Sequence, residues 1–380
     1  MAITVHQNPQ DYTPSDNPVV WVFSSNQTIQ ANFYFLIEVY IDNVVTERHR
    51  VYPEQGSRAH FNASFITERK AQANSGNYYD HRTLNEIKIK ITEYYSGSAQ
   101  SNTTTSNIKF FKARLRKSDF VEYNYQNYVL SSSSTSSKFL TLIPRGTDKA
   151  KGFESKLISV LTDGSGVNFR FKTYTSLGVL IDNVGVNIPA GDNLINLVCG
   201  VEELIADISL NFTNAAYYTI DGDSGGGVTE IYKINIDTVC DYAYAKRLHW
   251  MNSLGGIDSY TFGLISREKT EVKSFGYERE FGAFDSSGNY EFDMKRGTVV
   301  DYLKKFNRKI SITSNWMSAK VQNWLSKSLY TSPLVWLEEN NELYRVKITN
   351  KTFETKLQEN DMLIQETAEI ELESDESVNL

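Results

Sequence analysis

Strict alternation of apolar and polar residues recurs along this chain and limits the folds that it can adopt. In EIKIKIT, residues 86–92, Ile87, Ile89 and Ile91 alternate with Lys88 and Lys90. The same period of two occurs in YKINID (232–237), YRVKIT (344–349) and AEIELE (368–373). Successive side chains of a strand point to opposite faces, so each segment predicts a strand with one buried and one solvated face. Such strands are typical of antiparallel sandwiches and barrels rather than of parallel α/β sheets.

One segment follows a helical period instead. The sequence NWMSAKVQNWLSKSLY, residues 315–330, places its apolar residues on one stripe, namely Met317, Val321, Trp324, Leu325 and Leu329. Ser314 precedes the stripe as a candidate N-cap, and Pro333 follows it as a stop signal. These features predict a helix near 315–330. A second, shorter helix is predicted over TVVDYLKKF, residues 298–306.

Low-complexity stretches divide the 380 residues into three predicted domains. SSSSTSS, residues 131–137, is interpreted as a linker, and SGSAQSNTTTSN, residues 96–107, as a mobile hairpin loop. The domains are an N-terminal β-sandwich (1–130), a middle β-sandwich (138–245) and a C-terminal β-rich domain (246–380) that contains the helix near 315–330. The predicted fold class is therefore mainly β, with tandem antiparallel β-sandwich domains and a C-terminal β-rich unit flanked by one helix.

Charge and cysteine content exclude several classes of function. The net charge is −7 and no long basic stripe occurs, so direct nucleic-acid binding is not expected. FFKARLRK, residues 110–117, is interpreted as a strand whose solvated face carries Lys112, Arg114 and Arg116, with contact to nucleic acid or an acidic partner as the alternative. No apolar run reaches 18 residues, and the N-terminus lacks the pattern of a secretory signal, so neither a membrane span nor a signal peptide is expected. Two cysteines, Cys199 and Cys240, are too few for a disulfide framework, and whether they pair is open.

The string GDSGG, residues 222–226, surrounds the nucleophilic serine of chymotrypsin-like proteases and makes Ser224 a candidate nucleophile. A serine triad also needs a histidine and a carboxylate. The histidines before Ser224 lack that family's setting, and the one after it, His249, stands in the wrong order. Asp, Gly and Ser also favour tight turns, and here they join two strand-like runs. We therefore interpret the string as a turn and keep a serine hydrolase as a remote alternative.

No metal, cofactor or catalytic site is assigned from the sequence. Asp221 and Asp223 alternate like calcium ligands, but Tyr232 stands where a calcium loop of the EF-hand type needs glutamate, so only a looser calcium site is kept as an alternative for this loop. Glu202, Glu203 and Asp207 lie close together, as carboxylates do on many surfaces.

The segment RLHWMNSLGGIDSYTF, residues 247–262, supplies the interaction candidates Trp250, Tyr260 and Phe262. They form either an aromatic surface for a sugar or a partner chain, or the core side of two strands joined by a glycine turn. The same alternatives apply to NPVVWVFSSN, residues 17–26, for which we predict a core strand.

Four stretches carry a family resemblance. NPVVWVFSSN (17–26), NFYFLIEVYIDN (32–43), KFLTLIPR (138–145) and RLHWMNSLGGIDSYTF (247–262) resemble segments of virion structural proteins of tailed phages that infect Bacteroidota. The resemblance implies a tail or connector component that assembles as a ring. By fold-level analogy, residues 246–380 are similar in outline to tail-tube and hub domains. No catalytic residue comes with the resemblance.

The resulting hypothesis is a non-enzymatic, ring-forming tail or neck subunit without cofactor. Its expected partners are copies of itself and other virion tail or neck proteins, its expected location is the virion, and it is made in the host cytoplasm. Aromatic-rich surfaces and open sheet edges agree with such an assembly role. The alternative is a β-sandwich protein that binds carbohydrate or a receptor.

Overall fold

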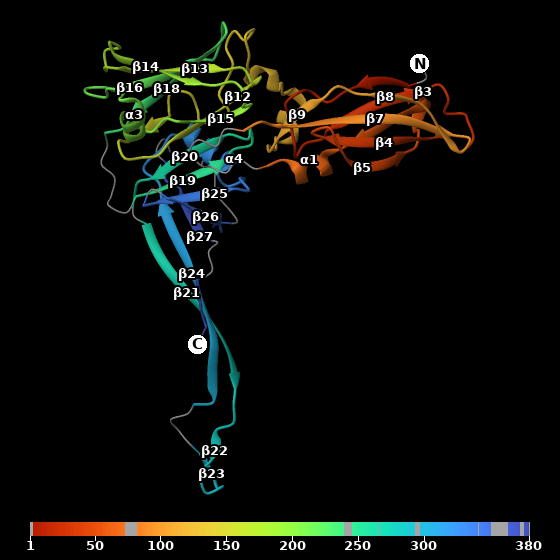
Figure 1. Cartoon of the computed structure of the whole chain (residues 1–380). Helices are drawn as coiled ribbons and strands as arrows, with labels where there is room; N and C mark the ends of the chain where they lie inside the picture. The colour runs from red at the N-terminus through yellow and green to blue at the C-terminus, as the bar shows by residue number, and fades with distance from the viewer. Residues whose placement is uncertain are drawn as a thin grey trace. The chain divides into compact units, whose positions relative to one another are not determined.

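The computed structural model describes residues 3–72, 82–238, 245–264, 266–292, 297–340, 342–350, 364–372 and 376–379 (Figure 1). The fold is mainly β, as predicted, with two tandem sandwiches and a C-terminal sheet. The chain forms two compact units, Met1–Val239 with Trp250–Ser259, and Cys240–His249 with Tyr260–Leu380. Contacts within the chain define these two units, and they do not show which parts would fold alone. The predicted domain boundaries at 130, 138 and 245 therefore stay predictions.

Helices are few and short within the described residues. The α-helices are α1 (Ser64–Lys70), α2 (Lys117–Glu122), α3 (Val201–Ile208) and α4 (Ala319–Ser328), and the 3-10 helices are η1 (Gln55–Ser57) and η2 (Tyr125–Tyr128). The sequence pattern predicted only α4. The other three α-helices have six to eight residues, too few for a helical period to stand out from the surrounding alternation.

The N-terminal sandwich consists of two sheets. One has the order β1 (Ile3–Gln7), β3 (Val20–Ser25), β6 (Arg58–Asn62). The other has the order β2 (Thr13–Pro14), β9 (Ile108–Phe111), β7 (Asn85–Tyr95), β4 (Tyr34–Ile41), β5 (Val44–Val51), with β8 (Ser98–Thr104) also on β7.

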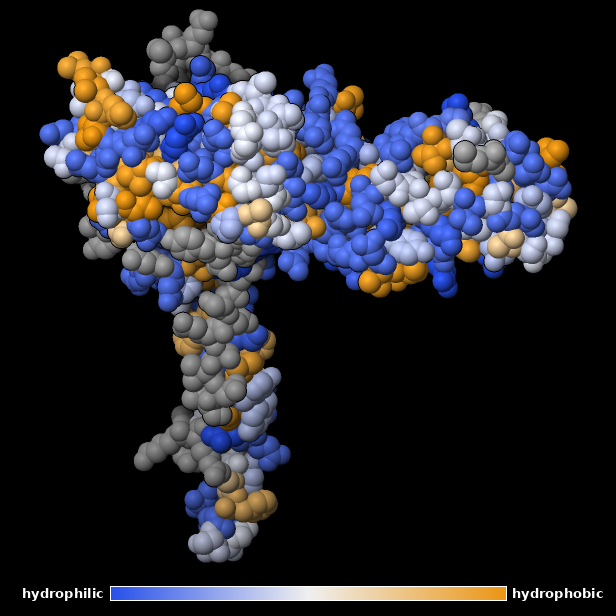
Figure 2. Space-filling view, turned by 45° about the horizontal axis from the view of Figure 1, so that its top comes forward, coloured by the Kyte–Doolittle hydropathy of each residue, from blue (hydrophilic) through white to orange (hydrophobic). Residues whose placement is uncertain are grey.

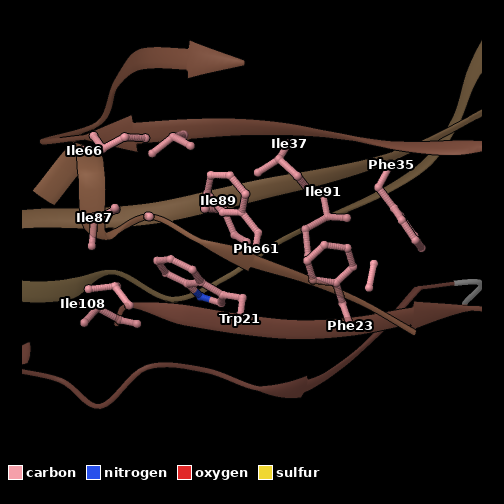
Figure 3. Close-up of a cluster of buried hydrophobic side chains, with 14 of the residues drawn as sticks. Trp21, Phe23, Phe35, Ile37, Phe61, Ile66, Ile87, Ile89, Ile91 and Ile108 are labelled. Carbon is pink, nitrogen blue, oxygen red and sulfur yellow. The ribbon is translucent and has the colours of Figure 1, made fainter. Parts of the chain in front are cut away.

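The core between these sheets confirms the alternation argument. Ile87, Ile89 and Ile91 of β7 are fully buried and point at Trp21 and Phe23 of β3 (Figure 3). Trp21 and Phe23 belong to the segment predicted as a core strand. The lysines between the isoleucines are partly exposed, so one face of the strand is dry and the other is wet.

The segment predicted as a mobile loop at 96–107 is mostly strand. Residues Ser98–Thr104 form β8, which pairs with β7. The turn is short because Ser96 and Gly97 both have positive φ, 54° and 77°, the combination that a two-residue type I′ hairpin requires. Serine and threonine do not prevent strand pairing when a partner edge is available.

The middle sandwich also has two sheets. One has the order β10 (Val129–Leu130), β12 (Leu157–Thr162), β15 (Leu194–Val198). The other has the order β11 (Lys149–Ala150), β18 (Tyr232–Ile236), β16 (Tyr217–Ser224), β13 (Val167–Tyr174), β14 (Leu180–Ile188), with β17 (Gly227–Val228) also on β16. A buried ion pair lies in this sandwich. The Lys156 ammonium is 2.5 Å from the Asp148 carboxylate, which also accepts the Tyr232 hydroxyl at 2.7 Å.

The serine-rich segment 131–137 is not a free linker, which corrects that interpretation. Ser134 and Ser137 exchange backbone hydrogen bonds with Val228 of β17 at 2.9 and 3.0 Å. A hydrophobic cluster that includes Tyr12, Phe111, Leu161 and Leu194 further joins the two sandwiches within the first unit. Packing of this kind overrides the tendency of a Ser-rich sequence to remain open.

The second unit is built on a large sheet. Its order is β20 (Ile257–Phe262), β19 (Lys246–Met251), β25 (Val335–Glu339), β26 (Glu342–Ile348), β27 (Thr367–Leu372), β24 (Val299–Thr313), β21 (Ser266–Glu278), with β28 (Glu376–Asn379) also on β24. Two further strands, β22 (Gly282–Phe284) and β23 (Tyr290–Phe292), form a separate hairpin.

Helix α4 lies where the apolar stripe predicted it, but it begins later. Its N-cap is Ser318, not Ser314. Ser314 is fully buried, and its hydroxyl accepts the backbone N–H of Glu366 at 2.9 Å. Trp324, Leu325 and Leu329 are buried, as the helical spacing indicated.

The helix predicted at 298–306 is wrong, because residues 299–306 lie in β24. A bulge explains the error. Residue 302 has no partner in the register between β21 and β24, where Phe275 pairs with Leu303 and Gly276 pairs with Asp301. An extra residue shifts the alternation by one, so the apolar Val300 and Leu303 fall three positions apart, as they would on a helix.

Candidate interaction site

Ser224 lies at the end of β16, in a tight hairpin. Asp223 pairs with Val228 and Ser224 with Gly227, which leaves Gly225 and Gly226 as the loop, with φ of 59° and 107°. Only a residue pair that tolerates positive φ fits this turn. The Ser224 side chain is buried, and its Oγ donates to the Gly166 carbonyl at 3.2 Å. Its proton is therefore directed at a backbone carbonyl, not at an imidazole.

The calcium alternative for the same loop has an electrostatic objection. One oxygen of Asp221 accepts from Arg170 Nε and the other from Lys172 Nζ, both at 2.7 Å. A carboxylate already neutralised by two cations is a poor cation ligand. Among the described residues, no group of three or more His, Cys, Asp or Glu could hold a metal ion.

The three aromatic candidates do not form a surface. Trp250 is fully buried and Phe262 is 1% exposed. Tyr260 is partly buried, with its ring 5.3 Å from Phe262 and 6.1 Å from Trp324. Trp250 and Phe262 are therefore core residues and offer no ring face to a sugar, which corrects their selection as interaction residues.

The remaining sequence candidates have structural roles. Lys112 lies just after the end of β9, so the segment from 110 is a strand only to Phe111, and its Nζ is 2.8 Å from Asp16. Glu203 accepts the Gly200 N–H at 3.1 Å at the start of α3. Cys199 is fully buried, whereas Cys240 lies outside the described residues, so their pairing stays open.

The feature that the sequence analysis missed is a long projecting pair of antiparallel strands, β21 with β24, whose outermost part has only these two strands among the described residues. We define the arm as strands β21 to β24. Strands β21 and β24 pair from Ser266 opposite Ile312 to Glu278 opposite Val299, and the β22–β23 hairpin follows them outward (Figure 1). The inner edge of β24 is covered by β27 and β28. Within the described part of the chain, the outer edge of β21 pairs with no strand.

The arm carries apolar side chains without burying them (Figure 2). Its exposed apolar and aromatic residues are Val272, Phe275, Tyr277, Phe281, Phe284, Tyr290, Phe292, Val299 and Tyr302. Phe284 and Phe292 are each at least 70% exposed. A group of exposed apolar and aromatic side chains on one segment is typical of a surface that another molecule covers.

The tip of the arm is an ordered aromatic cluster. Phe284 and Tyr290 pair across the β22–β23 hairpin, with ring centres 5.3 Å apart, and Phe292 is 5.5 Å from Tyr290. The turn between them is fixed by Asp285, whose carboxylate accepts two backbone N–H groups at 2.8 Å. The hydrogen bond from the Asn289 backbone lowers the pKa of Asp285. The aromatic rings are therefore held in place although solvent surrounds them.

The base of the arm is held by an ion cluster. Arg308 of β24 donates to Glu339 of β25 at 2.8 Å and to Glu268 of β21 at 2.9 Å. The hydrogen bond from Arg308 lowers the pKa of Glu339 to about 2. Lys246 of β19 also contacts Glu339. This cluster therefore links β21, β24, β25 and β19 at the base of the arm.

Comparisons with known proteins give no family. No family model matches the chain, and no curated protein matches it. The chicken CNTN1 FN1–FN3 domains match with 11% identity and a TM-score of 0.20, over 62% of this chain and 64% of that one. The chicken interferon gamma receptor alpha chain matches with 10% identity and a TM-score of 0.20, over 62% of this chain and 96% of that one. Likenesses this weak carry no argument about function.

A third solved structure, alpha-2-macroglobulin from Escherichia coli, matches with 9% identity and a TM-score of 0.18, over 100% of this chain and 22% of that one. Among the described residues, none of the helices has the length and apolar character needed to cross a membrane.

Proposed function

We propose that this chain is a non-enzymatic structural subunit that assembles with copies of itself, with the arm as a principal contact. The more specific form of the proposal is a ring-forming tail or neck subunit of a phage virion. The observation that carries the assembly role is the arm, with its exposed aromatic residues and its open outer edge.

A physical argument supports a partner for the arm. Beyond Leu303, where the pairing of β24 with β28 ends, the described part of the arm has only two strands. A two-stranded ribbon in water is marginally stable, because it has no second layer against which to bury a face. The distal part of this arm also exposes Phe275, Tyr277 and Phe284 to solvent. Contact with another molecule would bury these rings and order the ribbon at the same time. The fixed Asp285 turn indicates a tip that is preorganised for such a contact.

The virion context rests on a different observation. Residues 17–26, 32–43, 138–145 and 247–262 resemble segments of phage virion proteins. In this proposal the two sandwiches hold neighbouring virion proteins, and the arm contacts sister copies. The role requires no bond to be broken, and Ser224 serves as a hairpin residue within it.

The experiment is light scattering on the purified full chain across a concentration series. We expect masses that are multiples of 43.3 kDa, and rings in negative-stain images once a neighbouring virion protein is added. The double variant Phe284→Ser, Phe292→Ser should reduce association, because it removes two exposed rings from the tip. Leu177→Ser is the matched control, since Leu177 is 89% exposed on the middle sandwich and not on the arm.

A chain that stays at 43.3 kDa at its highest soluble concentration, with or without a neighbouring protein, contradicts the assembly role. Absence of the protein from purified phage particles contradicts the virion context alone.

A further inference from the structure

The outer edge of β21 has properties that identify its partner. The strand has 13 residues, Ser266–Glu278, and it stands at the end of the strand order of its sheet. An edge of this length presents a row of backbone N–H and C=O groups that a second strand can pair with.

The residues of β21 are complementary to themselves about Val272. When two copies of the strand lie antiparallel with Val272 opposite Val272, the opposing pairs are Glu271 with Lys273, Thr270 with Ser274, Lys269 with Phe275 and Arg267 with Tyr277. Each pair occurs twice, because the arrangement has a two-fold axis. Opposite charges, hydroxyl pairs and a cation facing an aromatic ring are all favourable across two strands.

The two neighbouring registers place like charges opposite each other. The two-fold axis that relates the two strands is perpendicular to the sheet, so it leaves each side chain on the same face of the sheet. Directly opposed residues share a face, so the axis must pass midway between a residue and its own copy. Centring the pair on residue 271 places Lys269 opposite Lys273, and centring it on residue 273 places Glu268 opposite Glu278. Like charges directly opposite each other are destabilising. The charge pattern therefore favours the register centred on Val272 over both neighbours.

The charge at position 273 also fits this register. Lys273 lies on the exposed strand β21, and Glu271 of the second copy lies opposite Lys273 in the register described above, so the contact pairs each Lys273 with a carboxylate.

We propose that β21 pairs with β21 of a second copy of this chain, antiparallel and centred on Val272. The inference rests on the proposed self-assembly and names the contact. The contact is isologous, so by itself it joins two copies, and ring closure needs a second, heterologous contact.

The first test is Lys273→Glu. In one copy the new carboxylate lies on an exposed strand position opposite Lys305, a pair of opposite charges, so the fold is retained. Between two copies it lies opposite Glu271 at both symmetric positions. We expect the association constant measured by sedimentation velocity to fall roughly tenfold, since two favourable pairs become unfavourable. The triple variant Glu271→Lys, Lys273→Glu, Lys309→Met restores opposite charges between copies and should recover most of the association. Lys309→Met is included because Lys309 is 2.6 Å from Glu271 in the same arm and would repel a lysine at that position.

Lys305→Glu is the matched control. It makes the same charge change in the same cross-strand pair, but on β24, whose residue 305 faces β28 on its other side and not the outer edge. We expect Lys305→Glu to leave association unchanged. Equal losses in Lys273→Glu and Lys305→Glu would show an effect of net charge alone and would overturn the inference.

A pair of cysteine variants tests the register directly. Val272→Cys places two thiols opposite each other, within the distance of a disulfide, and should give covalent dimers under oxidation. Ser274→Cys places its two thiols about 13 Å apart along the strands and should not. Normal assembly of the Lys273→Glu variant, together with no cross-linking of the Val272→Cys variant, overturns the edge contact but leaves the proposed function in place. A wild-type chain that never associates overturns both.

Discussion

Two antiparallel strand pairs in this protein have similar backbone pairing but different sources of stability. In the β4–β7 pair, Ile37 and Val39 lie opposite Ile91 and Ile89, and all four are fully buried. In the β21–β24 pair, exposed ion pairs such as Glu271 with Lys309 take their place. The first pair is stabilised by burial against the opposite sheet. The second lacks that burial over its outer length, which is why we expect a partner molecule to supply it.

Truncation of one apolar side chain in each pair is the strongest test of this difference. Ile89→Ala removes a fully buried side chain and should lower the free energy of unfolding by about 2–5 kcal/mol. Val272→Ala removes a side chain that is 50% exposed and should change it by less than about 0.5 kcal/mol in the monomer. Urea titration followed by circular dichroism measures both. Equal losses would mean that the arm has a buried core of its own.

The ion pairs of the two regions provide the next comparison. Lys156→Met leaves the Asp148 carboxylate buried without its cation, at an expected cost of about 3 kcal/mol. Lys309→Met breaks the exposed pair with Glu271 on the arm, and we expect no measurable shift of the urea midpoint, because solvent already screens that pair. A midpoint shift in Lys309→Met as large as that in Lys156→Met would contradict this account.

The ion cluster at the base of the arm predicts a smaller effect that depends on pH. Folding lowers the pKa of Glu339 from 4.5 to about 2. The stabilisation from this group is therefore complete above the ordinary carboxylate pKa and is lost as the pH falls toward about 2. Glu339→Gln should lower the urea midpoint at pH 7, and the difference from the wild type should shrink between pH 4.5 and 2. A difference that stays constant over this range would show that the Glu339 charge is not responsible.

Alternation predicted strands well wherever one face of a strand is buried, as in β7, β18, β26 and β27. It failed on the arm because both faces of the arm are wet, so the sequence of β21 alternates charges of both signs instead of apolar and polar residues. The exposed aromatic residues between 275 and 292 were a signal that could have been noticed, since a water-exposed loop seldom carries so many.

Local sequence patterns could not predict the candidate site. Trp250 and Phe262 have the residue types of a binding surface, but both side chains are buried. The exposed rings of the arm lie mainly on β21 and on the β22–β23 hairpin, which the sequence analysis did not predict as strands. Exposure depends on what packs against a residue, and a short window of sequence does not contain that information.

The sequence by itself determined the fold class, the position of α4 and the glycine turn after Ser224, because these depend on side-chain period and on the φ values that glycine allows. Tertiary structure alone decided that the serine-rich segment pairs with β17, that Trp250 is buried and that β21 is left at an edge. Those outcomes depend on contacts between residues far apart in the chain, and burial and edge exposure are properties of the assembled sheets.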